Sequence, residues 1–162
     1  MTDIEIKHLE DVPHLAPTVA RWIEEEWRRL PIHDYFDDVV TGKPRVSGLP
    51  QTLVAVHDGV AIGTVSLLRD DMETRPDLNP WVGCLFTERP YRNQRLGTEL
   101  VRAAERVAET LGIDELFLYT VRHANLFARL GWEKFGEEAY EGEICTLMRR
   151  RPSARSELRP ET

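Results

Sequence analysis

Residues 81–111 read WVGCLFTERPYRNQRLGTELVRAAERVAETL, and this stretch decides the fold of the chain. Residues 81–87 are apolar around Gly83, which predicts a buried strand. Residues 88–96 are mostly polar and basic, which predicts a loop. From Leu96 to Leu111, apolar residues return at three- and four-residue steps, which predicts one face of an amphipathic helix. Gly112 directly after these residues predicts the end of the helix.

A loop that leads into a helix binds anions for a physical reason. The first backbone N–H groups of a helix have no partner inside the helix, and the helix dipole adds partial positive charge there. Phosphate groups bind at such places. The sequence therefore predicts that the loop at residues 88–96 holds the pyrophosphate of a coenzyme.

The composition is that of one globular domain of 162 residues, with 41% hydrophobic and 30% charged residues. Residues 149–162 carry a net charge of +3 and residues 1–148 carry −10. Such an acidic body disfavours nucleic acid, whose binding draws on Lys and Arg. It suits a cationic substrate such as an amine, although solubility alone also explains an acidic surface.

The chain carries no signal for a leader, a membrane span or a metal. Its N-terminus is charged, and no apolar run approaches ~18 residues, so we expect a cytoplasmic protein with no membrane partner. Cys84 and Cys145 lie in apolar runs without C-x-x-C spacing, which predicts buried thiols. No H-E-x-x-H motif occurs, so no metal is expected.

The rest of the chain predicts a mixed α/β fold. Asp58-Gly59 joins two β-rich runs as a hairpin turn. Residues 70–80, DDMETRPDLNP, form an acidic loop. Strands are expected at 3–9, 51–57, 60–69, 113–120, 132–135 and 143–148, and helices from Asp11 or Pro13 to Leu30 and at 122–130. Residues 31–50 are irregular. The order β-α-(α)-β-β-β-α-β-α-β-β predicts a mixed sheet with helices on both faces.

Two segments resemble the Gcn5-related N-acetyltransferase (GNAT) superfamily, and within it the small bacterial acetyltransferases: FTERPYRNQRLGTELVRAAERVAETLGIDELFLYT and LFARLGW. The resemblance in element order covers residues 3–149, so the expected domain is 1–149. Residues 150–162 are expected to be a disordered basic tail. The family's coenzyme motif is Q/R-x-x-G-x-G/A. Arg92 and Gly97 match its first and last positions, whereas Arg95 replaces its first glycine.

The resemblance implies that acetyl-CoA donates an acetyl group to a primary amine by direct attack. The amine belongs to a small molecule or to a protein N-terminus. The family also implies a splayed central strand pair that admits the pantetheine arm, with Gly83 at a bulge, and a possible homodimer. The implied coenzyme-binding residues are Leu85, Phe86, Thr87, Arg92, Asn93, Gln94, Arg95, Leu96, Gly97, Thr98 and Phe127.

A missing side chain is expected to help coenzyme binding at Gly97, whereas a large side chain replaces the motif glycine at Arg95. A side chain at position 97 would stand between the loop backbone and the pyrophosphate. If position 95 needs a left-handed backbone, an arginine there costs roughly 1–2 kcal/mol. The arginine instead compensates if it contacts a phosphate. A solvated, outward-pointing Arg95 is the plain alternative.

The attacking amine must be neutral, but an exposed lysine-like amine has a pKa near ~10.4, so a base is useful. The candidates are Asp71, Glu73 and His123, each of which surface charge also explains. Many family members place a tyrosine at the position of Phe127, and phenylalanine has no proton to give. Water or Tyr119 would then protonate the thiolate. This departure keeps open an alternative, a coenzyme-A-binding module with little or no catalysis.

Overall fold

The computed structural model of the chain describes residues 3–27, 48–92 and 95–152. Asn93, Gln94, most of the irregular stretch 31–50 and residues 153–162 of the expected tail lie outside the described residues. Two compact units are formed, one by residues 1–67 and 83–104, the other by residues 68–82 and 105–162. We describe each unit by itself.

A mixed sheet runs through the described part of the chain in the order β1-β2-β3-β4-β5-β7-β6, which confirms the predicted α/β class. Its strands are β1 (Ile4–His8), β2 (Gln51–His57), β3 (Val60–Leu68), β4 (Trp81–Thr87), β5 (Leu116–Thr120), β6 (Glu133–Tyr140) and β7 (Glu143–Arg150). The helices are α1 (Ala16–Trp27), α3 (Leu96–Thr110) and α4 (Ala124–Arg129). Three short 3₁₀ turns are η1 (Leu9–Asp11), η2 (Pro13–Leu15) and η4 (Arg89–Tyr91).

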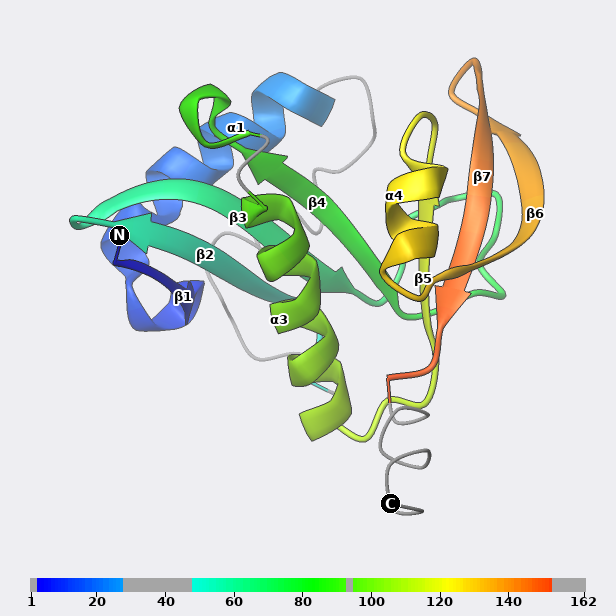
Figure 1. The fold of residues 1–162 in the computed structure, drawn as a ribbon, viewed down its shortest axis with the longest axis horizontal. Helices are drawn as coiled ribbons and strands as arrows, with labels where there is room; N and C mark the ends of the chain where they lie inside the picture. The colour runs from blue at the N-terminus through cyan, green and yellow to red at the C-terminus, as the bar shows by residue number, and fades with distance from the viewer. Residues whose placement is uncertain (1–2, 28–47, 93–94, 153–162) are drawn as a thin grey trace. The chain divides into compact units, whose positions relative to one another are not determined.

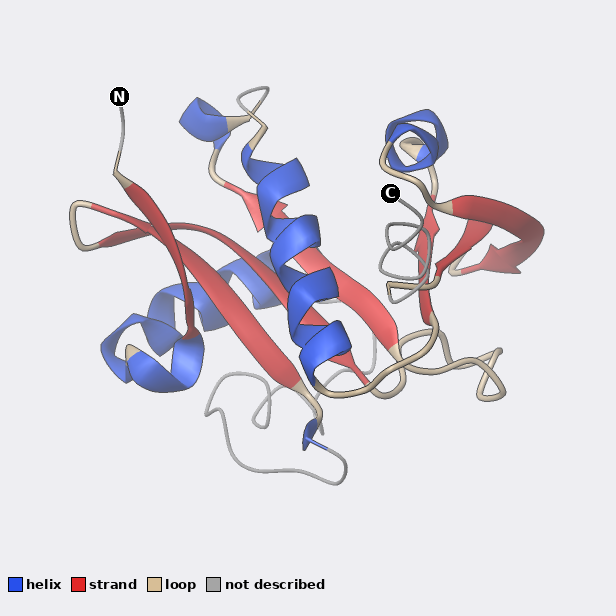
Figure 2. Ribbon diagram, turned by 60° about the horizontal axis from the view of Figure 1, so that its bottom comes forward, coloured by secondary structure: helices blue, strands red, loops and turns tan. Residues whose placement is uncertain are grey.

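In the first unit, α1 and the first part of α3 cover opposite faces of strands β2 and β3, as Figures 1 and 2 both show. Trp22 of α1 is 2% exposed and so belongs to the core. The predicted hairpin turn is confirmed, because Asp58 and Gly59 both have positive φ, at 53° and 78°.

Gly63 of β3 lets α3 approach the sheet closely. A Cβ added at Gly63 would lie 3.0 Å from the Phe86 carbonyl oxygen and 3.1 Å from Leu100 Cδ1. A larger residue would therefore press on both β4 and α3. Gly63 thus limits how the start of α3 and β4 pack against β3. No local sequence pattern predicts this role of Gly63.

In the second unit, β5 and β6 both pair with β7 in antiparallel register. The last two strands are longer than predicted, because Glu141 and Gly142 form a tight turn with φ of 51° and 80° and so extend the hairpin. β6 lies at the edge of the sheet, where its three glutamates have solvent access. That acidic composition masked the strand signal. Gly112, with φ of 78°, ends α3 as predicted.

A buried carboxylate organises the turn of the LGW segment. Glu105 of α3 is 3% exposed, and it accepts a hydrogen bond of 3.0 Å from Trp132 Nε1. The same carboxylate forms an ion pair of 3.2 Å with Arg150. Gly131 has φ of 99°, and a Cβ there would collide with the Arg150 guanidinium. The glycine and tryptophan of this turn therefore have a structural role in the second unit.

Candidate functional site

The loop between β4 and α3 is closed onto its own strand by Arg92. The Arg92 Nε donates a hydrogen bond of 3.0 Å to the Thr87 carbonyl oxygen. Its guanidinium lies 5.7 Å from the centre of the Phe86 ring, within the range of a cation–π contact. Arg92 therefore caps the loop. A phosphate contact stays a prediction.

The backbone at Arg95 is left-handed, with φ of 68°. This is the conformation that favours glycine, so the arginine holds the loop at a cost of about 1–2 kcal/mol. Arg95 is exposed, and its carbonyl oxygen accepts the hydrogen bond of 3.0 Å from Glu99 N. The residue that departs from the family motif therefore keeps the backbone shape that the motif glycine would give.

Gly97 shows the reverse arrangement. Its φ is not among the positive values, and a Cβ built on it meets no atom of the described residues within 4 Å. Neither backbone conformation nor packing inside the protein requires glycine at this position. The missing side chain leaves the start of α3 open, which fits the approach of a phosphate to the backbone N–H groups.

Apart from Phe127, the remaining described residues of the predicted coenzyme set lie in the same unit, next to this loop. Leu96 is 4% exposed and anchors the start of α3 in the core. Thr98 is half-buried in the first turn of the helix. Leu85, Phe86 and Thr87 are half-buried at the end of β4. Strand, loop and helix thus bring these residues into one continuous segment.

The irregular residue of β4 is Cys84 rather than Gly83. Cys84 has φ of 52°, a left-handed value inside a strand, and Gly83 does not. The left-handed residue of β4 therefore directly follows Gly83, and the bulge at Gly83 stays a prediction. Among the described residues, β4 and β5 share one register pair, Trp81 with Phe117, at the start of both strands. A parallel pair joined at one end fits the predicted splay.

The acidic loop belongs to the second unit, and its Asp71 carboxyl has an unusual pKa. Asp71 is half-buried, and loss of solvent raises its pKa from 3.8 to about 7. Its neighbour Glu73 is exposed, and the Glu73 backbone N–H donates to the Tyr140 hydroxyl at 3.4 Å. Burial also raises the pKa of Tyr140, and the Glu73 and Asp71 carboxylates raise it further.

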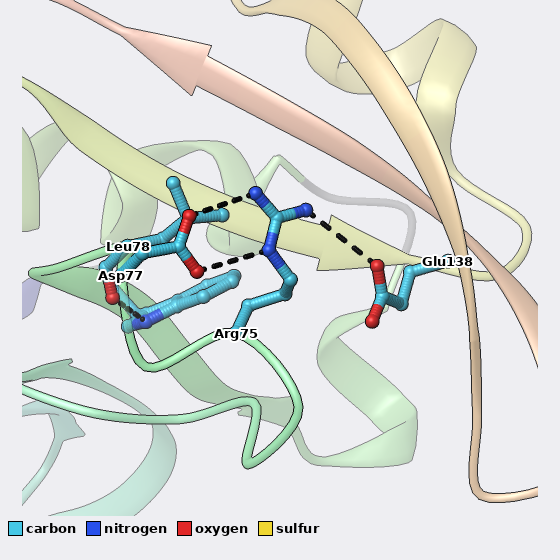
Figure 3. Close-up of polar contacts among 5 residues, drawn as sticks. Arg75, Asp77, Leu78 and Glu138 are labelled. Carbon is cyan, nitrogen blue, oxygen red and sulfur yellow. Dashed lines mark hydrogen bonds and ion pairs between the residues drawn. The ribbon is translucent and has the colours of Figure 1, made fainter.

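Two groups of contacts hold the acidic loop, and both were missed from sequence. Arg75 binds Asp77 through two hydrogen bonds, of 3.0 and 2.9 Å, and lies 3.5 Å from Glu138 of β6 (Figure 3). The ring of Tyr119 lies 5.6 Å from that of Tyr140 and 5.9 Å from that of Trp81. The R-x-D spacing is a local sequence signal for the contact between Arg75 and Asp77. No local signal indicates the contact between Arg75 and Glu138 of β6.

His123 and Phe127 belong to the segment of α4, where His123 precedes the helix and Phe127 lies within it. His123 is exposed before α4, and its backbone N–H donates to the Thr120 hydroxyl at 3.0 Å. Phe127 is 7% exposed, and its ring lies 6.4 Å from that of Trp132. Phe127 therefore packs in the core of the second unit. Its predicted contact with the coenzyme stays a prediction.

Metal and membrane features are absent from the described part of the chain. In residues 3–27, 48–92 and 95–152, no three His, Cys, Asp or Glu side chains gather in a way that would hold a metal ion. Within the same residues, no helix combines the length and apolar character that a membrane crossing needs. Cys84 and Cys145 are buried and form no disulfide, as predicted.

The chain belongs to the acetyltransferase (GNAT) family, whose model matches residues 13–136. No curated protein matches it. An aminoglycoside 6'-N-acetyltransferase complexed with coenzyme A superposes with a TM-score of 0.70 at 12% identity, over 91% of this chain and 97% of that one. An acyl-CoA N-acyltransferase from Pseudomonas aeruginosa gives 0.66 at 23% identity, over 93% and 99%. A GNAT-family acetyltransferase from Streptococcus pneumoniae gives 0.68 at 19%, over 92% and 99%. This protein is therefore an acyltransferase of the GNAT family.

Proposed function

We propose that the protein moves the acetyl group of acetyl-CoA to a primary amine by direct attack of the amine on the thioester. The observation that carries this proposal is the segment from Arg95 to Gly97. Its left-handed backbone at Arg95 and its open glycine leave the first N–H groups of α3 free to approach. The pyrophosphate of the coenzyme is the anion proposed for that place.

The coenzyme contacts are divided between backbone and side chains. Leu85, Phe86 and Thr87 offer strand backbone groups to the pantetheine arm. Residues 92–98 surround the pyrophosphate, with Arg92 and Arg95 as cations near it. An apolar contact of Phe127 with the coenzyme stays a prediction. A coenzyme-A-bound relative with the same fold supports this assignment.

Asp71 is the proposed general base. A base works best when its pKa lies near the working pH, and the Asp71 pKa of about 7 meets that condition. The ammonium form of the acceptor first gives one proton to Asp71. The neutral nitrogen then bonds to the acetyl carbon as the C–S bond breaks, the sulfur leaves as a thiolate, and the second proton that the nitrogen releases ends on the thiolate. Because a thiol has a pKa near ~8.5, the thiolate is a fair leaving group, and Tyr119 or water protonates it. Glu73 and His123 are the secondary candidates for the base.

The acceptor is proposed to be cationic before it loses its proton, because residues 1–148 carry a net charge of −10. A small-molecule amine and a protein N-terminus both satisfy this condition. No nucleic acid is expected to bind such an acidic body. The cytoplasmic location and the homodimer stay predictions.

Thiol release from acetyl-CoA across a panel of amines, together with calorimetric titration of coenzyme A, tests the proposal. We expect coenzyme binding and amine-dependent thiol release. Binding without turnover on any amine would instead favour a coenzyme-binding module, an alternative that Phe127 in place of a proton donor supports. Absence of coenzyme binding would reject both.

A further inference from the structure

A carboxylate stands at the first position of the proposed coenzyme loop, where negative charge is unfavourable for an anionic ligand. Glu88 follows the last residue of β4, and it is half-buried. Its carboxylate repels a neighbouring phosphate, and the repulsion grows as the two approach. The other charged residues described between 88 and 95 are the cations Arg89, Arg92 and Arg95. Glu88 therefore opposes the charge of the rest of the loop.

The Glu88 carboxylate is bound by a residue far away in the sequence. Trp22 of α1 donates its indole N–H to Glu88 Oε2 at 3.3 Å. Trp22 is 2% exposed, and its ring lies 5.0 Å from that of Phe86. The Glu88 backbone N–H donates to the Ile62 carbonyl oxygen of β3 at 2.9 Å. Both the backbone and the side chain of Glu88 are therefore fixed.

The hydrogen bond from Trp22 points the Glu88 carboxylate toward one particular face of the sheet in the first unit. In Figures 1 and 2, α1 lies on the face of β2 and β3 opposite to α3. The bond to Trp22 therefore directs the Glu88 carboxylate toward the α1 face. The open N–H groups proposed to bind the pyrophosphate belong to the start of α3, on the other face.

We propose that Trp22 is a positioning residue for coenzyme binding, whose indole N–H holds the Glu88 carboxylate away from the pyrophosphate. This inference rests on the proposed function. Without the indole N–H, the carboxylate is free to rotate toward the loop and to compete with the phosphates for its N–H groups and arginines. The simpler role of Trp22, packing on Phe86, predicts a different outcome for the variants below.

The test is a double-mutant cycle in the full-length protein, read as the coenzyme A dissociation constant by calorimetry at low salt. Trp22→Phe keeps an aromatic ring against Phe86 but removes the N–H, and we expect coenzyme affinity to fall about three- to fivefold. Glu88→Gln removes the charge and is expected to keep or improve affinity. In the double variant, affinity should return to that of Glu88→Gln, because no carboxylate remains to be positioned.

Two further readouts separate charge from packing. At about 1 M salt the loss in Trp22→Phe should shrink, because the screening length falls to about 3 Å. With S-acetylpantetheine, which lacks phosphate groups, Trp22→Phe should leave kcat/KM for thiol release unchanged. Trp132→Phe is the matched control, since Trp132 also donates its indole N–H to a buried carboxylate. Any effect of Trp132→Phe should persist when Glu88→Gln is added.

The outcomes are distinguishable. An affinity loss in Trp22→Phe that persists in the double variant would assign Trp22 a packing role only and overturn the inference. An unchanged affinity in Trp22→Phe would overturn it as well. In both cases, coenzyme binding by the unaltered protein would leave the proposed function standing. A wild-type protein that binds no coenzyme A would reject the proposed function and the inference together.

Discussion

The loop proposed to bind the coenzyme, in the first unit, offers backbone atoms to a ligand. The acidic loop of the second unit offers side-chain atoms. In the coenzyme loop, residues 88–97, the groups offered to a ligand are backbone N–H groups, and Gly97 contributes by having no side chain. In the acidic loop, residues 70–80, the groups are side chains, foremost the Asp71 carboxyl with its pKa of about 7.

This difference decides how much change each loop tolerates. A backbone site depends on the path of the chain, so Arg95 can replace the motif glycine as long as its φ of 68° is kept. A side-chain site depends on the surroundings of a single group. Asp70 and Asp71 are adjacent aspartates, but Asp70 is exposed, whereas loss of solvent raises the pKa of Asp71. We expect substitutions in the two loops to separate coenzyme binding from acyl transfer, and five predictions test this difference between the loops.

The largest effect is expected from Gly97→Trp. The indole would cover the first N–H groups of α3, and each hydrogen bond to a charged group is worth about 1.5–3 kcal/mol, so losing two weakens coenzyme A binding about a thousandfold. Calorimetric titration measures this. The melting temperature should stay within a few degrees, because a side chain at Gly97 has open space. Thr110→Trp, at the exposed end of the same helix, is the control. Unchanged coenzyme affinity in Gly97→Trp would reject this site.

Asp71→Asn is expected to leave coenzyme affinity unchanged and to lower kcat on the order of a hundredfold, because an amide accepts no proton. In the wild type, kcat/KM for the amine should rise with pH up to about 7, where Asp71 becomes ionised, and this rise should vanish in the variant. Asp70→Asn is the matched control, since Asp70 is the adjacent aspartate. A wild-type pH dependence that survives in Asp71→Asn would point to another base, with Glu73 and His123 as the next variants.

The same carboxyl predicts a pH dependence of stability. Because its pKa is raised in the folded state, the folded protein binds more protons than the unfolded chain between about pH 4 and pH 7. Stability from this group is complete below pH 4 and is lost as the pH rises through about 7. The melting temperature of Asp71→Asn should therefore be higher than that of the wild type at pH 8, and the two melting temperatures should be similar at pH 4. Equal differences at both values would contradict the burial of this group.

Arg95→Gly is expected to relieve the left-handed strain and to raise the melting temperature by about 2–4 °C, which corresponds to about 1 kcal/mol. Coenzyme affinity should be retained if the loop backbone carries the contact. Glu141→Gly is a matched control, because Glu141 has φ of 51° in the β6–β7 hairpin. A large loss of affinity in Arg95→Gly alone would show that the arginine side chain binds phosphate.

The smallest effect is expected from Arg75→Ala, which removes the contacts of the acidic loop with Asp77 and Glu138. A looser loop should raise KM for the amine by less than about tenfold, as for other exposed ion pairs, and leave coenzyme affinity unchanged. Lys134→Ala is the control, because it breaks a surface ion pair with Glu137 of the same strand, β6. An equal change in coenzyme affinity would mean that the two loops are not separate in function.

The predictable part of this protein is the part built from local patterns. The hairpin turn at Asp58-Gly59, the start of α3 at Leu96 and its end at Gly112 were each indicated by neighbouring residues. The GNAT family was indicated by the loop and LGW segments and confirmed by the family match. These features need no knowledge of distant contacts.

The errors and omissions concern contacts between distant parts of the chain. The irregularity of β4 falls at Cys84, although glycine is the usual signal. The acidic β6 was predicted too short, because its strand pairing with β7 outweighs its composition. The partners of the acidic loop, Tyr140 and Glu138, come from a strand about 65 residues later, and no local pattern announces them.

By itself, the sequence indicated the family and the order of strands and helices, and it predicted a coenzyme loop before α3, because helix periodicity and turn residues act over a few positions. Tertiary structure alone decided the left-handed backbone of Arg95, the pKa of Asp71 and the bond from Trp22 to Glu88. Those depend on what surrounds a residue after folding, when burial removes water and brings partners from far along the chain. Gly97 depends on both levels. The sequence supplies the glycine, and only the tertiary structure shows that the space around it is open.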